Sequence, residues 1–108
     1  MAKKIKPPKL SGREIRLLRS LGHHRPVLAM IGKEGVTATL VKSVQDNLTA
    51  HELVKIRIQD TCPLEREQAV AELALAAGAA VVQILGKTAL LYRPNPDLNE
   101  ERKISLNG

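Results

Sequence analysis

The hydrophobic positions between residues 10 and 22 recur with the period of an α-helix. One side of this segment carries a stripe of large apolar residues, namely Ile15, Leu17, Leu18 and Leu21. The other side carries three arginines, Arg13, Arg16 and Arg19. Ser11 and Glu14 have the spacing of a capping box, and Gly22 is a typical stop signal. The pattern predicts an amphipathic helix over about residues 12–21 with a buried apolar side and a basic outer side.

Four shorter apolar runs have the length of β-strands and are bounded by residues that favour turns. They are Val27–Ile31, Leu53–Ile58, Ala80–Leu85 and Thr88–Tyr92. The second run alternates, so that Lys55 and Arg57 share one partly polar face. The last two runs flank Gly86-Lys87, which is the spacing of a β-hairpin.

Two more helices are predicted between these strands. Thr37 can cap a helix over about residues 38–50, and Pro63 fits the first turn of another that ends at Gly78. The order α-β-α-β-α-β-β predicts a single α/β domain with a four-stranded mixed sheet, whose first three strands are parallel and whose last is antiparallel. Residues 10–94 make up this domain, between a basic flexible arm at 1–9 and a loose polar tail at 95–108.

Charge is distributed unevenly along the chain. The 108 residues have a formal net charge of +6, and residues 1–57 hold twelve Lys and Arg against four Asp and Glu, whereas residues 58–108 hold five against seven. Such a balance favours a polyanionic partner, nucleic acid ahead of a membrane surface. Tyr92 is the single residue among Phe, Trp and Tyr, which disfavours modules that stack bases on several aromatic rings.

A glycine loop, Gly32-Lys33-Glu34-Gly35, lies between the first predicted strand and the second predicted helix. Two glycines at this spacing let the backbone approach a phosphate, toward which the helix N-terminus also points. A tight turn that needs glycines for its backbone angles alone is the competing interpretation. The candidate RNA-binding residues are Gly32, Lys33, Glu34, Gly35, Thr37, Arg13, Arg16, Arg19, Lys55 and Arg57.

Enzyme and metal chemistry find little support in the sequence. Gly86-Lys87-Thr88 has the sequence that ends a Walker loop. The motif also requires a glycine five residues before Gly86, and that position is occupied by Val81. His23-His24 and His51 lack carboxylate or thiol partners at ligand spacing, and the single Cys62 can form neither an internal disulfide nor a CxxC site. We therefore expect a soluble, cytoplasmic, monomeric protein that is not an enzyme and has no cofactor, metal, membrane or small-molecule partner.

Four stretches of the chain carry a resemblance to a known family. They are Ile31-Gly32-Lys33-Glu34-Gly35-Val36-Thr37, His51-Glu52-Leu53-Val54-Lys55-Ile56, Val82-Gln83-Ile84-Leu85-Gly86-Lys87-Thr88 and Leu91-Tyr92-Arg93-Pro94. With these stretches, residues 10–93 and 101–106 resemble the CRM family (chloroplast RNA splicing and ribosome maturation), in particular its stand-alone bacterial YhbY-type members. The resemblance implies an RNA-binding domain related in fold to the C-terminal domain of translation initiation factor three. It also implies that the GxxG loop lies on the RNA-facing surface.

Two functional hypotheses follow. The bacterial members of the family are associated with precursors of the large ribosomal subunit, which implies a non-catalytic assembly factor. Such a factor would contact the rRNA backbone through the GxxG loop and the adjoining basic helix. The alternative is a protein-interaction or scaffold module whose basic face docks an acidic partner without direct RNA contact.

Overall fold

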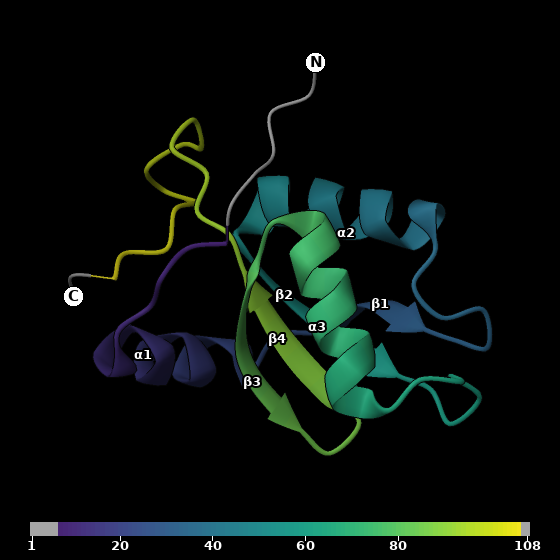
Figure 1. Cartoon of the computed structure of the whole chain (residues 1–108). Helices are drawn as coiled ribbons and strands as arrows, with labels where there is room; N and C mark the ends of the chain where they lie inside the picture. The colour runs from purple at the N-terminus through teal and green to yellow at the C-terminus, as the bar shows by residue number, and fades with distance from the viewer. Residues whose placement is uncertain (1–6, 107–108) are drawn as a thin grey trace.

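The computed structural model describes residues 7–106, which form three helices and four strands (Figure 1). In chain order these are α1 (Gly12–Gly22), β1 (Val27–Ile31), α2 (Ala38–His51), β2 (Leu53–Ile58), α3 (Arg66–Ala77), β3 (Ala80–Leu85) and β4 (Thr88–Tyr92). The predicted single α/β domain is confirmed. Most of the predicted basic arm, residues 1–6, lies outside the described residues.

The four strands form one mixed sheet in the order β1-β2-β4-β3. β1 pairs parallel with β2, and β4 lies antiparallel between β2 and β3, so the first three strands share one direction as predicted. The hairpin turn between β3 and β4 contains Gly86 with a φ of +58°, a conformation that glycine adopts without strain.

Helices cover both faces of the sheet, but unequally (Figure 1). α2 and α3 pack on one face, where Val44, Leu48 and Leu73 meet Val54 and Ile56 in the larger core cluster. On the other face α1 packs without a second helix from the described residues, and a smaller cluster forms there around Leu18, Leu53, Val82, Leu90 and Tyr92. One helix of eleven residues cannot cover a face that two helices cover on the other side.

The end of α1 differs from the prediction. Leu21, which was expected in the core, is 39% exposed, because α1 has reached the margin of the small cluster by this residue. Gly22 is the last helical residue and is buried, and a Cβ atom at this position would overlap the Leu90 side chain. Gly22 therefore allows the close approach of α1 to β4.

The start of α3 also differs, because Pro63 is not in its first turn. The helix begins at Arg66, after a turn in which the Cys62 amide donates to the Gln59 carbonyl at 3.0 Å. Cys62 and Leu64 pack against the larger cluster. These contacts hold the segment before Arg66 in a non-helical conformation. Gly78 ends α3 in the left-handed conformation (φ 72°), as predicted for a helix stop.

The segment after β4 is attached to the domain, which corrects the expectation of a loose tail. Glu52, with only 2% of its surface exposed, accepts hydrogen bonds from the backbone amides of Asn95 (2.6 Å) and Ile104 (2.7 Å). Ile104 and Leu106 pack against the smaller cluster. The domain boundaries of the sequence analysis stay a prediction.

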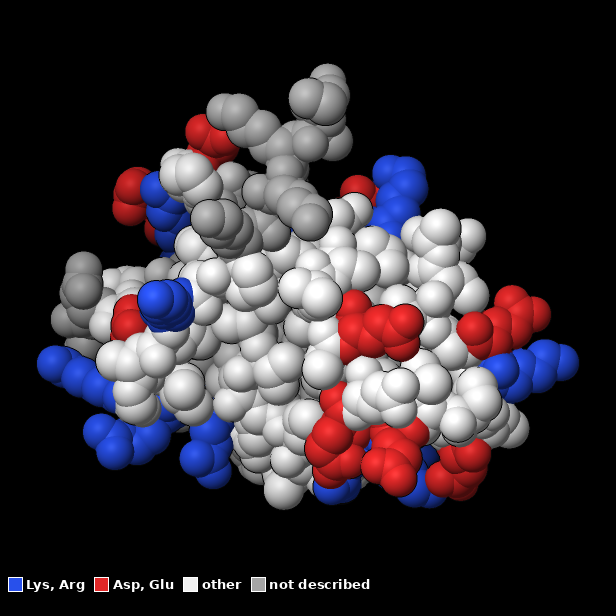
Figure 2. Space-filling view, in the orientation of Figure 1, with Lys and Arg blue, Asp and Glu red and all other residues white. Residues whose placement is uncertain are grey.

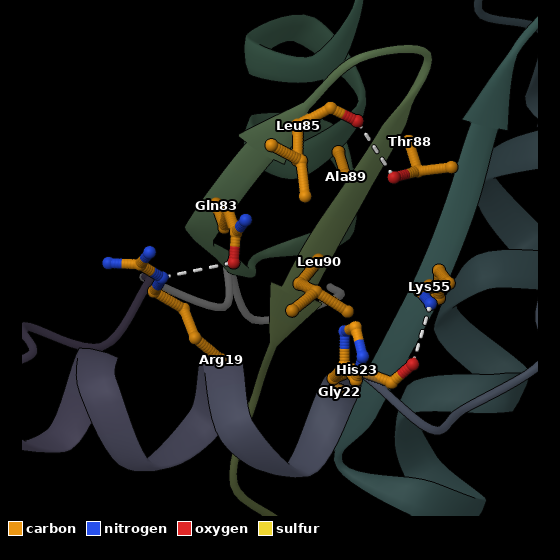
Figure 3. A pocket seen from close by; sticks show the side chains of 9 residues that line it. All are labelled: Arg19, Gly22, His23, Lys55, Gln83, Leu85, Thr88, Ala89 and Leu90. Atoms are coloured by element: carbon orange, nitrogen blue, oxygen red, sulfur yellow. Dashed lines mark hydrogen bonds between the residues drawn. The ribbon is translucent and has the colours of Figure 1, made fainter.

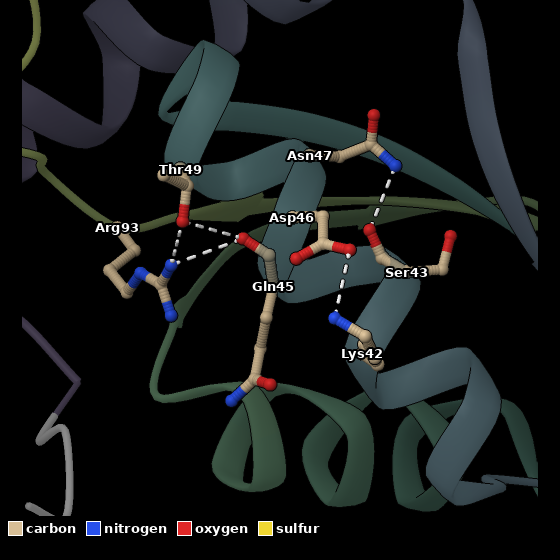
Figure 4. Close-up of polar contacts among 7 residues, drawn as sticks. All are labelled: Lys42, Ser43, Gln45, Asp46, Asn47, Thr49 and Arg93. Atoms are coloured by element: carbon tan, nitrogen blue, oxygen red, sulfur yellow. Dashed lines mark hydrogen bonds and ion pairs between the residues drawn. The ribbon is translucent and has the colours of Figure 1, made fainter.

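Arg93, directly after β4, ties the ends of two helices together (Figure 4). Its guanidinium donates to the Ala77 carbonyl at the end of α3 (2.9 Å), and to the Gln45 carbonyl (3.2 Å) and the Thr49 hydroxyl (2.9 Å) on α2. A cation at helix C-termini also interacts favourably with the helix dipoles. Burial lowers the pKa of Arg93.

We expect Tyr92 to ionise only in strong alkali. Burial, assisted by the carboxylates of Glu52 and Glu14, raises the pKa of its hydroxyl to about 12. The unfolded chain loses this proton at about pH 10, so the free energy of unfolding should fall as the pH rises from about 10 to 12. Phenolate absorbance reports Tyr92 alone, because the chain has no other tyrosine and no tryptophan. Equal titration midpoints in native and urea-unfolded protein would contradict the raised pKa of Tyr92.

Candidate nucleic-acid interface

α1 leaves part of its face of the sheet uncovered, and strand register defines which residues lie there. Side chains of paired residues in neighbouring strands point to the same side. Lys55 pairs with Leu90, which pairs with Gln83; Arg57 pairs with Met30 and with Thr88, which pairs with Leu85. α1 leaves part of this surface uncovered, and we call that part the open face. It consists of Met30, Lys55, Arg57, Gln83, Leu85 and Thr88.

The first part of the open face is a shallow depression beside the last turn of α1 (Figure 3). Arg19 reaches over it from the helix, and its Nε donates to Gln83 Oε1 at 3.1 Å. Lys55 Nζ donates to the His23 carbonyl oxygen at 3.4 Å. Both cations are thus held by neutral partners at the rim, and neither forms an ion pair with another residue of the described part of the chain.

A second depression next to it brings Arg16 together with Arg19, His23, Gln83 and Leu85. The third lies at the far end of the sheet, where Met30 and Arg57 meet Asp60 and Lys87. Lys87 forms an ion pair with Asp60 and lowers the pKa of that carboxyl group. Among the described residues that line these three depressions, Asp60 is the sole carboxylate, and its charge is compensated.

Acidic side chains gather elsewhere. Glu65, Glu67 and Glu72 lie at or on α3, on the opposite side of the sheet from α1. Figure 2 shows red side chains around the start of α3 and blue ones around α1, with a further group of red side chains on the C-terminal segment. Arg66 pairs with Glu67 at 2.7 Å and lowers the pKa of its carboxyl group. The α3 side should therefore repel a phosphate backbone, whereas the α1 side should attract one.

The glycine loop forms a tight turn at the end of β1. The Gly35 amide donates to the Gly32 carbonyl at 3.0 Å, and Gly35 has a φ of +69°, which favours glycine. Lys33 and Glu34 are exposed at the tip of the turn. The Thr37 hydroxyl caps α2 by accepting from the Leu40 amide at 3.1 Å. Gly35 thus has a structural reason, whereas Gly32 does not have a positive φ, and the tip presents one basic and one acidic side chain.

The structure brings together some of the predicted RNA-binding residues and separates others. Arg16, Arg19, Lys55 and Arg57 share the α1 side of the sheet, and none of them belongs to an ion pair within residues 7–106. The loop of residues 32–35 follows β1 directly and so lies at the edge of the sheet beyond Met30. Arg13, in the first turn of α1, is exposed but lines none of the three depressions.

Several residues of the open face were not predicted from the sequence. Gln83 interrupts an otherwise apolar strand, a signal that could have placed it on a partly polar face. Met30 and Leu85 gave no such signal, because exposed apolar residues in a strand have the same pattern as buried ones. Met30 is 53% exposed and Leu85 is 64% exposed.

Two further features of the described residues bear on metal binding and on membrane insertion. Within residues 7–106, no group of three or more His, Cys, Asp or Glu is placed to hold a metal ion. None of the helices in this part of the chain has the length and apolar character needed to cross a membrane.

These features define a small α/β domain with a mixed four-stranded sheet, helices on both faces and one basic, partly uncovered sheet surface. The chain belongs to the CRS1/YhbY (CRM) domain family, whose model matches residues 10–93. The resemblance found in the sequence is thereby confirmed.

Similar proteins are known from several bacteria. The probable RNA-binding protein YqeI of Bacillus subtilis is 30% identical over 97 residues, which is 90% of this chain and 98% of that protein. A protein of Haemophilus influenzae named as an RNA-binding protein is also 30% identical over 97 residues, covering 90% of this chain and 94% of the relative. The solution structure of a candidate RNA-binding protein from Staphylococcus aureus superimposes with a TM-score of 0.73 at 28% identity, covering 90% of this chain and all of the other.

Proposed function

We propose that this protein is an RNA-binding, non-catalytic assembly factor that acts on the precursor of the large ribosomal subunit in the cytoplasm. The observation that carries the RNA-binding part is the positive charge of Arg16, Arg19, Lys55 and Arg57 on one side of the sheet, none of which belongs to an ion pair among the described residues. Phosphate contacts from Lys and Arg supply most of the affinity in such interfaces. The relatives named as RNA-binding proteins support the same partner.

The glycine loop would add a backbone contact at the edge of this surface. Lys33 extends from its tip, and α2 begins directly beyond it with no acidic residue in its first turn. The positive end of the helix dipole is therefore not compensated by a carboxylate in that turn, and it favours a nearby phosphate.

Crosslinking and sequencing of bound RNA in growing cells tests the proposal. We expect the crosslinked reads to map to large-subunit rRNA and its precursor. Sedimentation with and without ribonuclease then separates the two hypotheses of the sequence analysis. If the protein stays with ribosomal particles after exposed RNA is digested, and no RNA is crosslinked, it is a scaffold module and the proposal is wrong.

Replacing Gly35 tests the loop, because two substitutions of equal shape differ in charge. Asn and Asp both tolerate a positive φ better than other residues, and a Cβ at Gly35 would meet Leu64 Cδ1 at an ordinary 3.8 Å. Gly35→Asp and Gly35→Asn should therefore lose similar stability, about 1 kcal/mol. We expect RNA affinity to fall about tenfold more in the Asp variant, as the loss of one charge-assisted contact would give.

RNA titration and thermal unfolding of the same two variants provide the measurement. Equal RNA affinities for the Asp and Asn variants would mean that the loop is a structural turn. In that case the contact surface would be confined to the sheet and α1.

A further inference from the structure

We propose that the open face binds unpaired RNA nucleotides, with Met30 and Leu85 in contact with the bases and the surrounding cations on the backbone. This inference rests on the proposed RNA-binding function and deepens it, because it names the form of RNA that the site recognises.

One row of residues across the sheet combines apolar, basic and polar side chains. Met30, Arg57, Thr88 and Leu85 lie side by side on β1, β2, β4 and β3. Two exposed apolar side chains thus stand at the ends of the row, with a guanidinium and a hydroxyl between them. A surface that meets only phosphates and sugars would gain nothing from the apolar side chains, which would lie exposed or against polar groups.

This combination of side chains matches the chemistry of a nucleotide that is not base-paired. Such a nucleotide offers an apolar ring face, polar ring edges and an anionic phosphate, whereas a duplex hides the ring faces in its stack. Guanidinium planes also stack on bases. Gln83, Thr88 and Lys55 place an amide, a hydroxyl and an ammonium group on the same surface, and Arg19 borders it.

The dimensions are also suitable. Four strands span three inter-strand spacings, about 14 Å at the usual strand separation. Other RNA-binding domains hold two or three bases on a four-stranded sheet of this width. Those domains stack the bases on aromatic side chains, whereas the surface here is aliphatic and cationic. Each base should therefore contribute less to the RNA affinity, and the phosphate contacts should contribute more.

Charge complementarity favours RNA over a protein partner of apolar character. The open face contains Lys55 and Arg57 and is bordered by Arg16 and Arg19, and the single carboxylate among the described residues of its depressions is paired with Lys87. An apolar protein surface would have to desolvate these cations without compensation, which is costly.

Binding of two probes of equal length tests the inference: oligouridylate as the unpaired strand, and a blunt-ended self-complementary RNA duplex. We expect the parent protein to bind oligouridylate about tenfold more tightly at equal salt, a difference within the range that base stacking supplies. The double variant Met30→Ser/Leu85→Ser should lose this preference without a change in its duplex affinity. Leu75→Ser on α3, a residue 72% exposed on the opposite side of the sheet, is the matched control and should behave as the parent.

The outcomes separate this inference from the proposed function. If both probes bind the parent equally, or if the double variant keeps the preference, the inference is wrong while RNA binding stands. If the double variant loses both affinities equally while remaining folded, the apolar residues do not select unpaired bases and the inference is again wrong. If neither probe binds the parent at any salt, the proposed RNA-binding function itself fails.

Discussion

RNA affinity should fall about a hundredfold when Arg19 and Arg57 are both replaced by Glu, since each substitution removes a contact to a charged group and adds repulsion. Both side chains are exposed on the α1 side, so the substitutions leave the two core clusters intact. Arg19 loses only its hydrogen bond to Gln83, and Arg57 forms no ion pair among the described residues.

The salt dependence of binding gives an independent measure of the same loss. For single-stranded RNA, the logarithm of affinity falls with the logarithm of salt by about 0.7 for each phosphate that a cation neutralises. The slope of the double variant should therefore be shallower by about 1.4, from two lost contacts. Titrations at several salt concentrations, with parent and variant side by side, provide this value.

Lys42→Glu is the control for charge alone. Lys42 lies on α2, on the other side of the sheet, and its side chain is 77% exposed. This variant changes the net charge as much as either single variant at Arg19 or Arg57 does, so it should alter RNA affinity several-fold less than each of them. An equal loss in all three variants would show that only net charge matters, and the basic surface would then have no special role.

The sequence predicted the elements of this fold because their signals are local. The capping box of Ser11 and Glu14 is present, with Ser11 Oγ accepting from the Glu14 amide at 3.2 Å. The alternation of β2 correctly placed Lys55 and Arg57 on one face. Each of these signals is contained within a few consecutive residues.

Other features depend on contacts between distant parts of the chain and could not be read from local patterns. The position of β4 between β2 and β3 is one, because right-handed crossovers fix strand direction but do not fix strand order. The exposure of Met30 and Leu85 is another, because it depends on how far α1 extends over the sheet. The same uncovered surface makes Lys55 and Arg57 accessible, so the candidate site itself is a consequence of the length of α1.

Glu52 is the clearest case of a residue whose role is invisible in the sequence. Its amide partners are 43 and 52 residues further along the chain, and it follows α2, where an exposed polar residue is ordinary. Its φ of +64° is rare for a residue other than glycine. A buried carboxylate in this conformation persists because its two oxygens bind the C-terminal segment.

Replacing Glu52 by Gln should lower the free energy of unfolding by about 2 to 3 kcal/mol. The amide has nearly the same shape, but it carries one acceptor oxygen and one NH2 donor where the carboxylate has two acceptor oxygens. Either the Asn95 amide or the Ile104 amide must then face the NH2 donor of the glutamine. The other amide keeps a hydrogen bond, but its acceptor is a neutral amide oxygen in place of a charged carboxylate oxygen. For a domain of this size the melting temperature should fall by roughly 10 °C.

The same substitution should release the C-terminal segment, because both of its carboxylate contacts come from Glu52. Arg102 and Lys103 lie within that segment, so limited trypsin digestion should cut there faster in the variant than in the parent. Glu101→Gln, an exposed change in the same segment, should leave both the melting temperature and the digestion rate unaltered. If Glu52→Gln melts and digests as the parent does, packing of Ile104 and Leu106 against the smaller cluster holds the segment without the carboxylate. Faster digestion at an unchanged melting temperature would instead mean that the segment is a separate, weakly coupled unit, which contradicts the expected loss of global stability.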